Sequence, residues 1–201
     1  MTESAPDPHR RKMARKKAAR ERLMARIDRE KGLLIVHTGP GKGKTTAALG
    51  MALRALGHGF KVGLVQFIKG ARDSAERKAL AAFGDQVAVR ALGEGFTWET
   101  QDKERDIAAT RRAWEEAAAM IADPAFRLVI LDEINVALRY GYLDLAEVLA
   151  VLVARPAATH VVATGRGAKE ELIAAADLVT EMTLVKHPFR EGIKAQPGIE
   201  F

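Results

Sequence analysis

The sequence contains no cysteine, few aromatic residues and no long apolar run. The absence of cysteine from the 201 residues excludes disulfide frameworks and thiolate metal sites, and it fits a reducing compartment. No apolar stretch approaches the roughly 18 residues of a membrane-spanning helix, so we expect no membrane segment. The basic N-terminus lacks the apolar core of a secretory signal. Together these absences favour a cytoplasmic protein.

Charge is distributed unevenly along the chain. Residues 1–31, the leader, hold eleven Lys/Arg and five Asp/Glu, whereas residues 32–201 hold 21 of each sign. We expect the leader to be partly disordered, with a helix from about Arg10 to Glu30, and we expect residues 32–201 to form the main domain. Because the main domain is neutral overall, binding to nucleic acid would depend on the leader alone.

Apolar strand-like segments alternate with helix-like segments along the main domain. The expected strands lie at 33–39, 61–68, 86–92, 126–133 and 178–185, with a strand and turn at 159–167. The expected helices lie at 45–57, 74–84, 103–122, 134–140, 143–155 and 169–176. This alternation predicts an α/β fold with a mostly parallel central sheet covered by helices on both faces. Ligands bind at the carboxyl ends of such strands, so the loops there should converge on one rim.

The strongest signal for a binding site is the glycine-rich stretch TGPGKGKTT, residues 38–46. Gly43, Lys44 and Thr45 match the second half of the Walker A pattern G-x-x-x-x-G-K-[ST], although Thr38 stands where the first glycine belongs. The stretch follows an expected strand and precedes an expected helix, as a phosphate-binding loop requires. Lys44 supplies a positive charge and Thr45 can reach a magnesium ion, whereas Lys42 either contacts phosphate or faces solvent.

Two carboxylates, Asp132 and Glu133, end the strongly apolar segment FRLVILDE. Proteins with a phosphate-binding loop hold magnesium with an acid in this position, directly or through water. Alternatively, one of the two caps the helix expected at 134–140. Either acid could be the main magnesium contact, and the capping role suits only one of them.

Other candidate residues carry weaker signals. Arg166, in the turn ATGRG, either binds phosphate or lies on the surface. Arg54 follows Lys44 by about three helical turns, so its proximity to phosphate is not assured. Phe96 and Trp98, in GEGFTWET, either pack into the core or form an aromatic flap over a large, flat ligand. No His or Asp stands in a recognisable catalytic-loop pattern, which argues against hydrolysis and against kinase chemistry.

Several of these motifs, taken together, resemble those of the corrinoid adenosyltransferases of the P-loop type. They are TGPGKGKTTAALG, VGLVQFIKG, GFTWETQD, LVILDEIN, VVATGRG and the tail VKHPF…GIKAQPGIEF, between residues 32 and 201. The resemblance implies a RecA-like P-loop NTPase fold that transfers the 5′-deoxyadenosyl group of ATP to the Co(I) centre of a corrinoid. Triphosphate would be released, in adenosylcobalamin biosynthesis or salvage. Since Co(I) is itself the nucleophile, the resemblance also accounts for the missing base.

The resemblance implies a role for each motif. Lys44, Thr45 and Glu133 would be the catalytic residues, and Thr45, Glu133 and Asp132 would hold Mg²⁺. Phe96 and Trp98 would bind the corrinoid and displace its lower axial ligand. ATP would be bound by Gly39, Pro40, Gly41, Lys42, Gly43, Lys44, Thr45, Thr46, Arg54 and Arg166. Pro40 departs from the Asn or Asp that is usual in the family, and proline lacks the backbone donor.

The resemblance also implies partners, and two other hypotheses stay open beside it. The implied partners are ATP, Mg²⁺, a reduced corrinoid, an external reductant such as a flavodoxin-type donor, and a second copy of the chain in a homodimer. The basic N-terminal helix would act as a lid over the active site. A RecA-like ATPase stimulated by nucleic acid would use the leader, although the neutral main domain argues against nucleic acid as a partner. An ATP-binding switch would instead sense the corrinoid without turnover.

Overall fold

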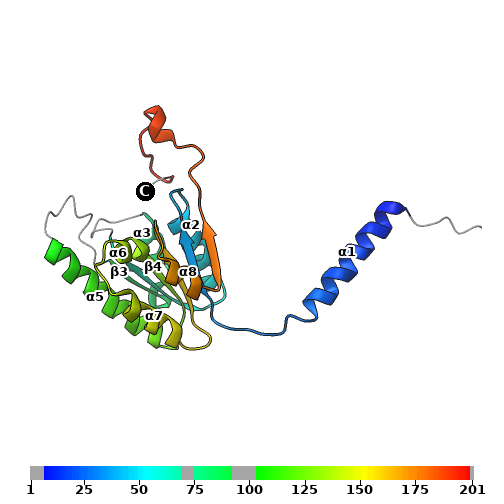
Figure 1. Cartoon of the computed structure of the whole chain (residues 1–201), viewed down its shortest axis with the longest axis horizontal. Coiled ribbons are helices and arrows are strands. Elements are labelled where there is room, and N and C mark those ends of the chain that lie inside the picture. The colour runs from blue at the N-terminus through cyan, green and yellow to red at the C-terminus, as the bar shows by residue number, and fades with distance from the viewer. Residues whose placement is uncertain (1–6, 69–74, 92–102, 200–201) are drawn as a thin grey trace, which may run out of the picture. The chain divides into compact units, whose positions relative to one another are not determined.

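The computed structural model of the chain describes residues 7–68, 75–91 and 103–199 (Figure 1). The chain divides into two compact units, residues 1–31 and residues 32–201. The predicted aromatic pair, Phe96 and Trp98, lies outside the described residues. Across the described ranges, no helix is both long and apolar enough to cross a bilayer.

The described residues of the first unit form one helix, α1, over Pro8–Met24. Asp7 caps it by accepting a hydrogen bond from the backbone N–H of His9 at 3.1 Å, and proline suits the first helical turn. The helix therefore starts earlier than predicted, and it also ends earlier. No side chain of α1 is buried within this unit, and its many Lys, Arg and Ala residues favour the helix locally. Ile27 and Asp28, beyond its end, are weaker helix formers than the Lys, Arg and Ala within it.

A six-stranded sheet, parallel throughout, forms the centre of the second unit. The strands are β1 Leu34–Thr38, β2 Lys61–Gln66, β3 Val87–Ala91, β4 Phe126–Asp132, β5 His160–Thr164 and β6 Leu178–Glu181. Their spatial order is β3-β2-β4-β5-β1-β6. The predicted α/β class is thereby confirmed. The order places β5 between β1, which leads into the glycine loop, and β4, which ends in the two acids.

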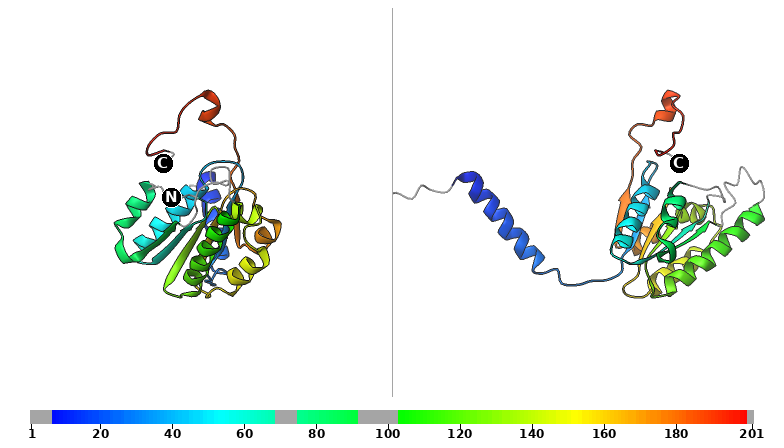
Figure 2. Two further views of the ribbon diagram at one scale, coloured as in Figure 1. Left: turned by 90° about the vertical axis from the view of Figure 1, so that its left-hand side faces the viewer. Right: turned by 180° about the vertical axis from the view of Figure 1, so that it is seen from behind.

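Helices cover both faces of this sheet (Figure 2). They are α2 Lys44–Gly57, α3 Ala75–Ala81, α5 Lys103–Ala122, α6 Ile134–Arg139, α7 Leu145–Ala154 and α8 Glu170–Ala175, with 3₁₀ turns η1 Gly84–Gln86 and η2 Pro188–Glu191. Helices α2 and α3 pack on the face that carries Ile35, Leu64 and Ile130. Helices α5 to α8 pack on the opposite face, which carries Val36 and Leu131. Apolar residues alternate between two buried faces, as expected for a parallel sheet.

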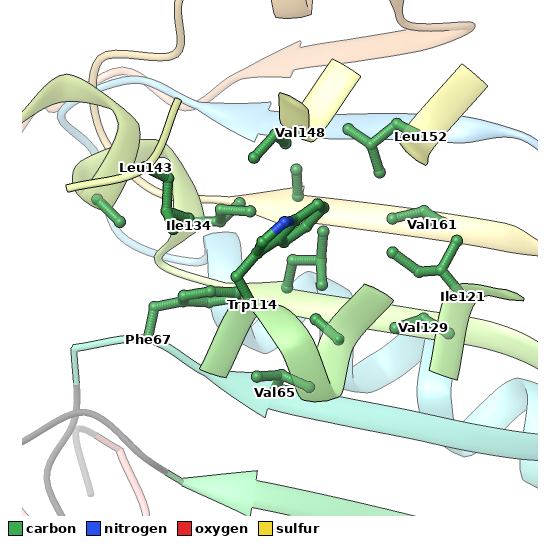
Figure 3. Close-up of a cluster of buried hydrophobic side chains, with 14 of the residues drawn as sticks. Val65, Phe67, Trp114, Ile121, Val129, Ile134, Leu143, Val148, Leu152 and Val161 are labelled. Atoms are coloured by element: carbon green, nitrogen blue, oxygen red, sulfur yellow. The ribbon is translucent and has the colours of Figure 1, made fainter. Parts of the chain in front are cut away.

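Trp114 of α5 lies at the centre of the larger of these two cores. Its ring packs among apolar side chains that include Ile134, Leu143 and Val148 (Figure 3). The indole Nε1 donates a hydrogen bond to Oε1 of Glu147 on α7 at 3.2 Å. The polar atom of this buried tryptophan is thus satisfied, and the contact fastens α5 to α7.

The last strand is shorter than predicted, because β6 ends at Glu181 rather than at residue 185. Among the described strands, β6 pairs only with β1. A backbone hydrogen bond from Met182 N to Thr38 O at 2.9 Å follows it, and there β1 turns into the glycine loop. The strand therefore stops where its neighbour stops, and residues 182–199 continue as an irregular tail that contains η2.

Candidate active site

The glycine loop, residues 39–43, joins the end of β1 to the start of α2. Gly39 and Gly43 have φ angles of +93° and +108°, a region that side chains rarely adopt. Gly43 is the N-cap of α2, and no described side chain caps this helix. The first backbone N–H groups of α2 therefore remain available to an anion such as phosphate.

The segment that follows β6 packs behind this loop. The backbone N–H of Gly41 donates to the carbonyl oxygen of Met182 at 2.7 Å. A Cβ atom at Gly39 would lie 2.5 Å from that same oxygen, and one at Gly41 would lie 2.5 Å from the oxygen of Thr183. Both positions therefore need glycine for the close approach of another backbone. Pro40, between them, is exposed and does not line the cavity described below, so proline removes no donor from the cavity wall.

Lys44 is buried beneath the loop, with 6% of its surface exposed. Its Nζ donates hydrogen bonds to the carbonyl oxygens of Gly39, at 2.8 Å, and of Gly41. Burial lowers the pKa of Lys44, the carboxylate of Glu133 opposes this effect, and the guanidinium of Arg166 adds to it. The charges of Glu133 and Arg166 both act on Lys44, and all three residues line the same cavity.

Asp132, at the end of β4, is 1% exposed and is held by three neutral donors. Its Oδ1 accepts hydrogen bonds from the hydroxyls of Thr45 and Thr164, each at 2.8 Å. Its Oδ2 accepts a hydrogen bond from Nε2 of Gln66 at 3.1 Å. Asp132 thus orients the Thr45 hydroxyl from below and does not itself line the cavity.

Glu133 is the one non-glycine residue with positive φ among those described, at φ 65° and ψ 18°. It occupies the N-cap position of α6, yet its carboxylate makes no capping hydrogen bond. The side chain instead lines the cavity. Glu133 therefore occupies the capping position without capping the helix through its carboxylate. A Cβ at Gly165 would lie 3.1 Å from Oε2 of Glu133, and the φ of Gly165 is +128°. The first glycine of TGRG therefore makes room for this acid.

A cavity of about 570 Å³ opens above these residues. Its size suits a small-molecule ligand such as a nucleotide. The lining residues are Gly41, Lys42, Gly43, Lys44, Thr45, Thr46, Glu76, Glu133, Val136, Arg139, Tyr140, Arg166 and Ile199. Four of them are Lys or Arg and two are Glu, so the wall carries a net positive charge that suits a triphosphate.

The structure brings most of the predicted site residues together, but not all of them. Residues 41–46, Glu133 and Arg166 line the cavity, and Asp132 lies beneath it in contact with Thr45. Lys42 is on the wall and is exposed, so its contact with phosphate stays a prediction. Arg54 is exposed in the last turn of α2, at the end remote from the glycine loop, and does not line the cavity. Its role stays a prediction.

Sequence reasoning missed several residues of the cavity wall. Val136 follows Glu133 by three residues, and Arg139 and Tyr140 follow Val136 by three and four, which places them on one side of α6 and its C-cap. Since α6 starts at the carboxyl end of β4, that spacing could have identified them. The stem of Arg139 also packs on Gly167, where a Cβ would lie 3.0 Å from its Cδ. Glu76 and Ile199 come from distant segments and carry no comparable signal.

Known proteins resemble this chain in sequence and in fold. A family model described as ATP:corrinoid adenosyltransferase BtuR/CobO/CobP matches residues 30–201. Corrinoid adenosyltransferases of Pseudomonas aeruginosa and a Sinorhizobium species are 56% and 58% identical to this chain. Each match covers 96% of this chain, and the two cover 95% and 91% of the relatives' own lengths. The crystal structure of the flagellar accessory protein FlaH from Methanocaldococcus jannaschii matches with a TM-score of 0.50, over 75% of this chain and 70% of that one. At 11% identity, this last match shows the fold alone.

Proposed function

The chain belongs to the ATP:corrinoid adenosyltransferase family, and on that premise we propose that it transfers the 5′-deoxyadenosyl group of ATP to the cobalt of a corrinoid. The family match over residues 30–201 confirms the resemblance seen in the motifs. The observation behind the proposal is the cationic cavity built on the glycine loop, in which Lys44, Thr45, Glu133 and Arg166 converge.

The reaction needs positioning and charge neutralisation more than it needs proton transfer. An electron pair of Co(I) forms the Co–C bond, the bond between C5′ and its oxygen breaks, and triphosphate leaves with the electrons of that bond. No proton moves, and no histidine lines the cavity within the described residues. The Lys44 and Arg166 cations and the N–H groups at the start of α2 would stabilise the charge that develops on the triphosphate.

The residues present also fit a magnesium ion. The Thr45 hydroxyl and the Glu133 carboxylate are hard oxygen ligands on the cavity wall, and Asp132 holds Thr45 from below. Nowhere in the described ranges do three or more His, Cys, Asp or Glu residues form a cluster that could hold a metal. Mg²⁺ is commonly bound by one or two protein ligands together with substrate phosphates, so this sparse ligand set suits it. We propose that Thr45 and Glu133 hold Mg²⁺, which would screen the charge of the triphosphate.

Other parts of the proposed function lie outside the described cavity. We propose that Phe96 and Trp98 bind the corrinoid and displace its lower axial ligand, and that Arg54 assists the phosphates. The leader would form a lid, because α1 carries eight Lys/Arg and one acidic residue, a charge suited to a triphosphate.

An external reductant such as a flavodoxin-type donor would supply the electrons that reduce the cobalt to Co(I). We also propose that the protein forms a homodimer and acts in the cytoplasm.

The test is a reaction of chemically reduced Co(I) corrinoid with ATP and Mg²⁺. We expect a light-sensitive product with a Co–C bond and one equivalent of inorganic triphosphate. ADP or phosphate as the main product, or a rate that DNA or RNA raises, would contradict the proposal. Binding of corrinoid and ATP without any Co–C bond in a single turnover would support a sensing role instead. Rates measured on complete and incomplete corrinoids would then define the preferred substrate.

A further inference from the structure

Thr164 stands between the glycine loop and the two acids because of the strand order. It is the last residue of β5, the strand inserted between β1 and β4. Its side chain is fully buried. The hydroxyl donates a hydrogen bond to Oδ1 of Asp132 at 2.8 Å, and the backbone N–H of Glu133 donates to the same hydroxyl at 3.0 Å. One oxygen atom therefore contacts both acidic residues.

The direction of these hydrogen bonds is determined by the groups themselves. A backbone N–H can only donate, so the Thr164 oxygen accepts from Glu133. The Thr164 hydroxyl donates to the carboxylate oxygen Oδ1 of Asp132, so its proton points toward that oxygen. The hydroxyl thus connects Asp132 to the one residue of the described chain, apart from glycines, that has a left-handed backbone. That backbone conformation is unfavourable for glutamate, so it needs a partner that holds it.

We propose that Thr164 is a positioning residue that orients Asp132 and Glu133 for magnesium and triphosphate binding. Gln66 would help to hold Asp132 through its other oxygen, Oδ2. Through Asp132, Thr164 orients the Thr45 hydroxyl. Through the Glu133 N–H, it holds the turn that directs the Glu133 carboxylate to the cavity wall. The inference rests on the proposed function of this site, because it assigns Thr164 to the support of a magnesium site.

A purely structural role for Thr164 makes a different prediction. In that case, loss of the hydroxyl would lower stability and leave the magnesium dependence of nucleotide binding unchanged. Thr159 offers a matched control at the other end of the sheet. It is also buried, with 1% exposed, and its hydroxyl donates to the carbonyl oxygen of Phe126 at 3.2 Å, away from the cavity.

The experiment compares Thr164→Val, Thr164→Ser and Thr159→Val with the full-length protein. Titration calorimetry with ATP at a series of Mg²⁺ concentrations gives the apparent magnesium affinity without any turnover. Residues that support metal ligands typically contribute 10- to 100-fold to metal affinity, so we expect a loss of about that size for Thr164→Val. Thr164→Ser, which keeps the hydroxyl, should stay within about threefold of wild type. Thr159→Val should lower the melting temperature without changing the magnesium affinity.

The outcomes separate this inference from the proposed function. If Thr164→Val is destabilised as Thr159→Val is and keeps wild-type magnesium affinity, Thr164 is structural and the inference is overturned. If wild type binds ATP with no magnesium dependence, the inference is overturned as well. If the magnesium effect of Thr164→Val appears but wild type forms no Co–C bond, the inference stands and the proposed function fails. Should Thr164→Val not fold, Gln66→Leu removes the opposite donor to Asp132, and unchanged magnesium affinity there would overturn the inference.

Discussion

The two ends of the central sheet use arginine in opposite ways. At the amino end, Arg155 is enclosed, with 12% of its side chain exposed, and it donates to four acceptors: the carbonyl oxygens of Gly32, Leu152 and Thr159 and the carboxylate of Asp177. At the carboxyl end, Arg139 and Arg166 are exposed on the cavity wall. Neither forms an ion pair within the part of the chain that the structure describes. An arginine whose acceptors are all supplied by its own chain stabilises the fold, whereas one without them is available to a ligand.

The glycines at the two ends differ in the same way. A Cβ at Gly32 would lie 2.1 Å from the carbonyl oxygen of Thr159, so the amino end is closed by tight backbone packing. Gly165, at the carboxyl end, leaves room for Glu133, a side chain that faces the cavity. Packing excludes solvent at the amino end, and it holds a charged group at the cavity wall at the carboxyl end. We therefore expect substitutions at the amino end to change stability and substitutions at the carboxyl end to change activity.

Lys44→Ala should have the largest effect. Removing one preorganised charge from a buried site of developing negative charge costs about 100- to 1,000-fold in rate, so we expect at least that loss in kcat/KM for Co–C bond formation. The measurement is the absorbance change of the Co(I) corrinoid under anaerobic conditions. Lys61→Ala is the matched control, since Lys61 lies over the ring of Phe126 at 4.5 Å and outside the cavity. A Lys61→Ala rate that fell as far would show that the loss is not specific to the carboxyl end.

Arg155→Met tests the amino end. It keeps the aliphatic stem but removes the hydrogen bonds to three carbonyl oxygens and to Asp177, which still accepts from the backbone N–H of Leu34. We expect the free energy of unfolding to fall by about 2–4 kcal/mol. Urea denaturation gives this free energy, and kcat per folded molecule should stay near wild type. A large fall in kcat with stability unchanged would break the comparison between the two ends.

Arg166→Met is the counterpart at the carboxyl end. The side chain is exposed and has no acceptor within the described chain, so we expect little change in the free energy of unfolding. Loss of its charge near Lys44 should lower kcat/KM by about 10- to 100-fold, less than at Lys44, because an exposed charge near the leaving triphosphate is screened by solvent. Destabilisation of the same size as in Arg155→Met, with normal kinetics, would show that Arg166 does not bind phosphate.

The sequence predicted the residues of the carboxyl end better than those of the amino end, because the motifs of the carboxyl end are local in the sequence. The carboxyl end consists of short motifs, GKGKTT, the Asp132–Glu133 pair and TGRG, whose meaning does not depend on their neighbours. The amino end is held by Arg155. Two of its four acceptors, on Leu152 and Thr159, are sequence neighbours, but Gly32 and Asp177 are 123 and 22 residues away, and no local pattern predicts those two contacts. The same limit applied to Thr164. Its contact with Asp132 depends on β5 lying between β1 and β4, an order that the alternation of strands and helices does not specify.

Gly165→Ala should give a smaller loss than Lys44→Ala, because it displaces an acid and removes no charge. Both the positive φ and the 3.1 Å contact with Oε2 of Glu133 oppose a methyl group there. We expect about a tenfold rise in the Mg²⁺ concentration needed for half-maximal rate, in line with the cost of disturbing a metal ligand from behind. Gly50→Ala is the control, since a Cβ at that helical position meets nothing within 4 Å. An unchanged magnesium dependence in Gly165→Ala would separate Glu133 from the metal.

His160 provides the smallest test, at the amino end. Its Nδ1 accepts a hydrogen bond from the backbone N–H of Leu33 at 3.1 Å, which only the unprotonated ring can do. Burial lowers the pKa of His160, and the guanidinium groups of Arg127 and Arg155 add to this effect. The unfolded chain, with a histidine pKa of 6.5, then takes up the proton first as the pH falls. The stabilising contribution of His160 is therefore present above about pH 6.5 and is lost as the pH falls below it.

Melting temperatures between about pH 8 and pH 5 should show a steeper fall for wild type than for His160→Gln, which keeps an acceptor but does not titrate. His160 lies at the start of β5 and Thr164 at its end. The magnesium affinity of folded His160→Gln should therefore equal that of wild type. A difference would mean that the two ends of β5 are coupled.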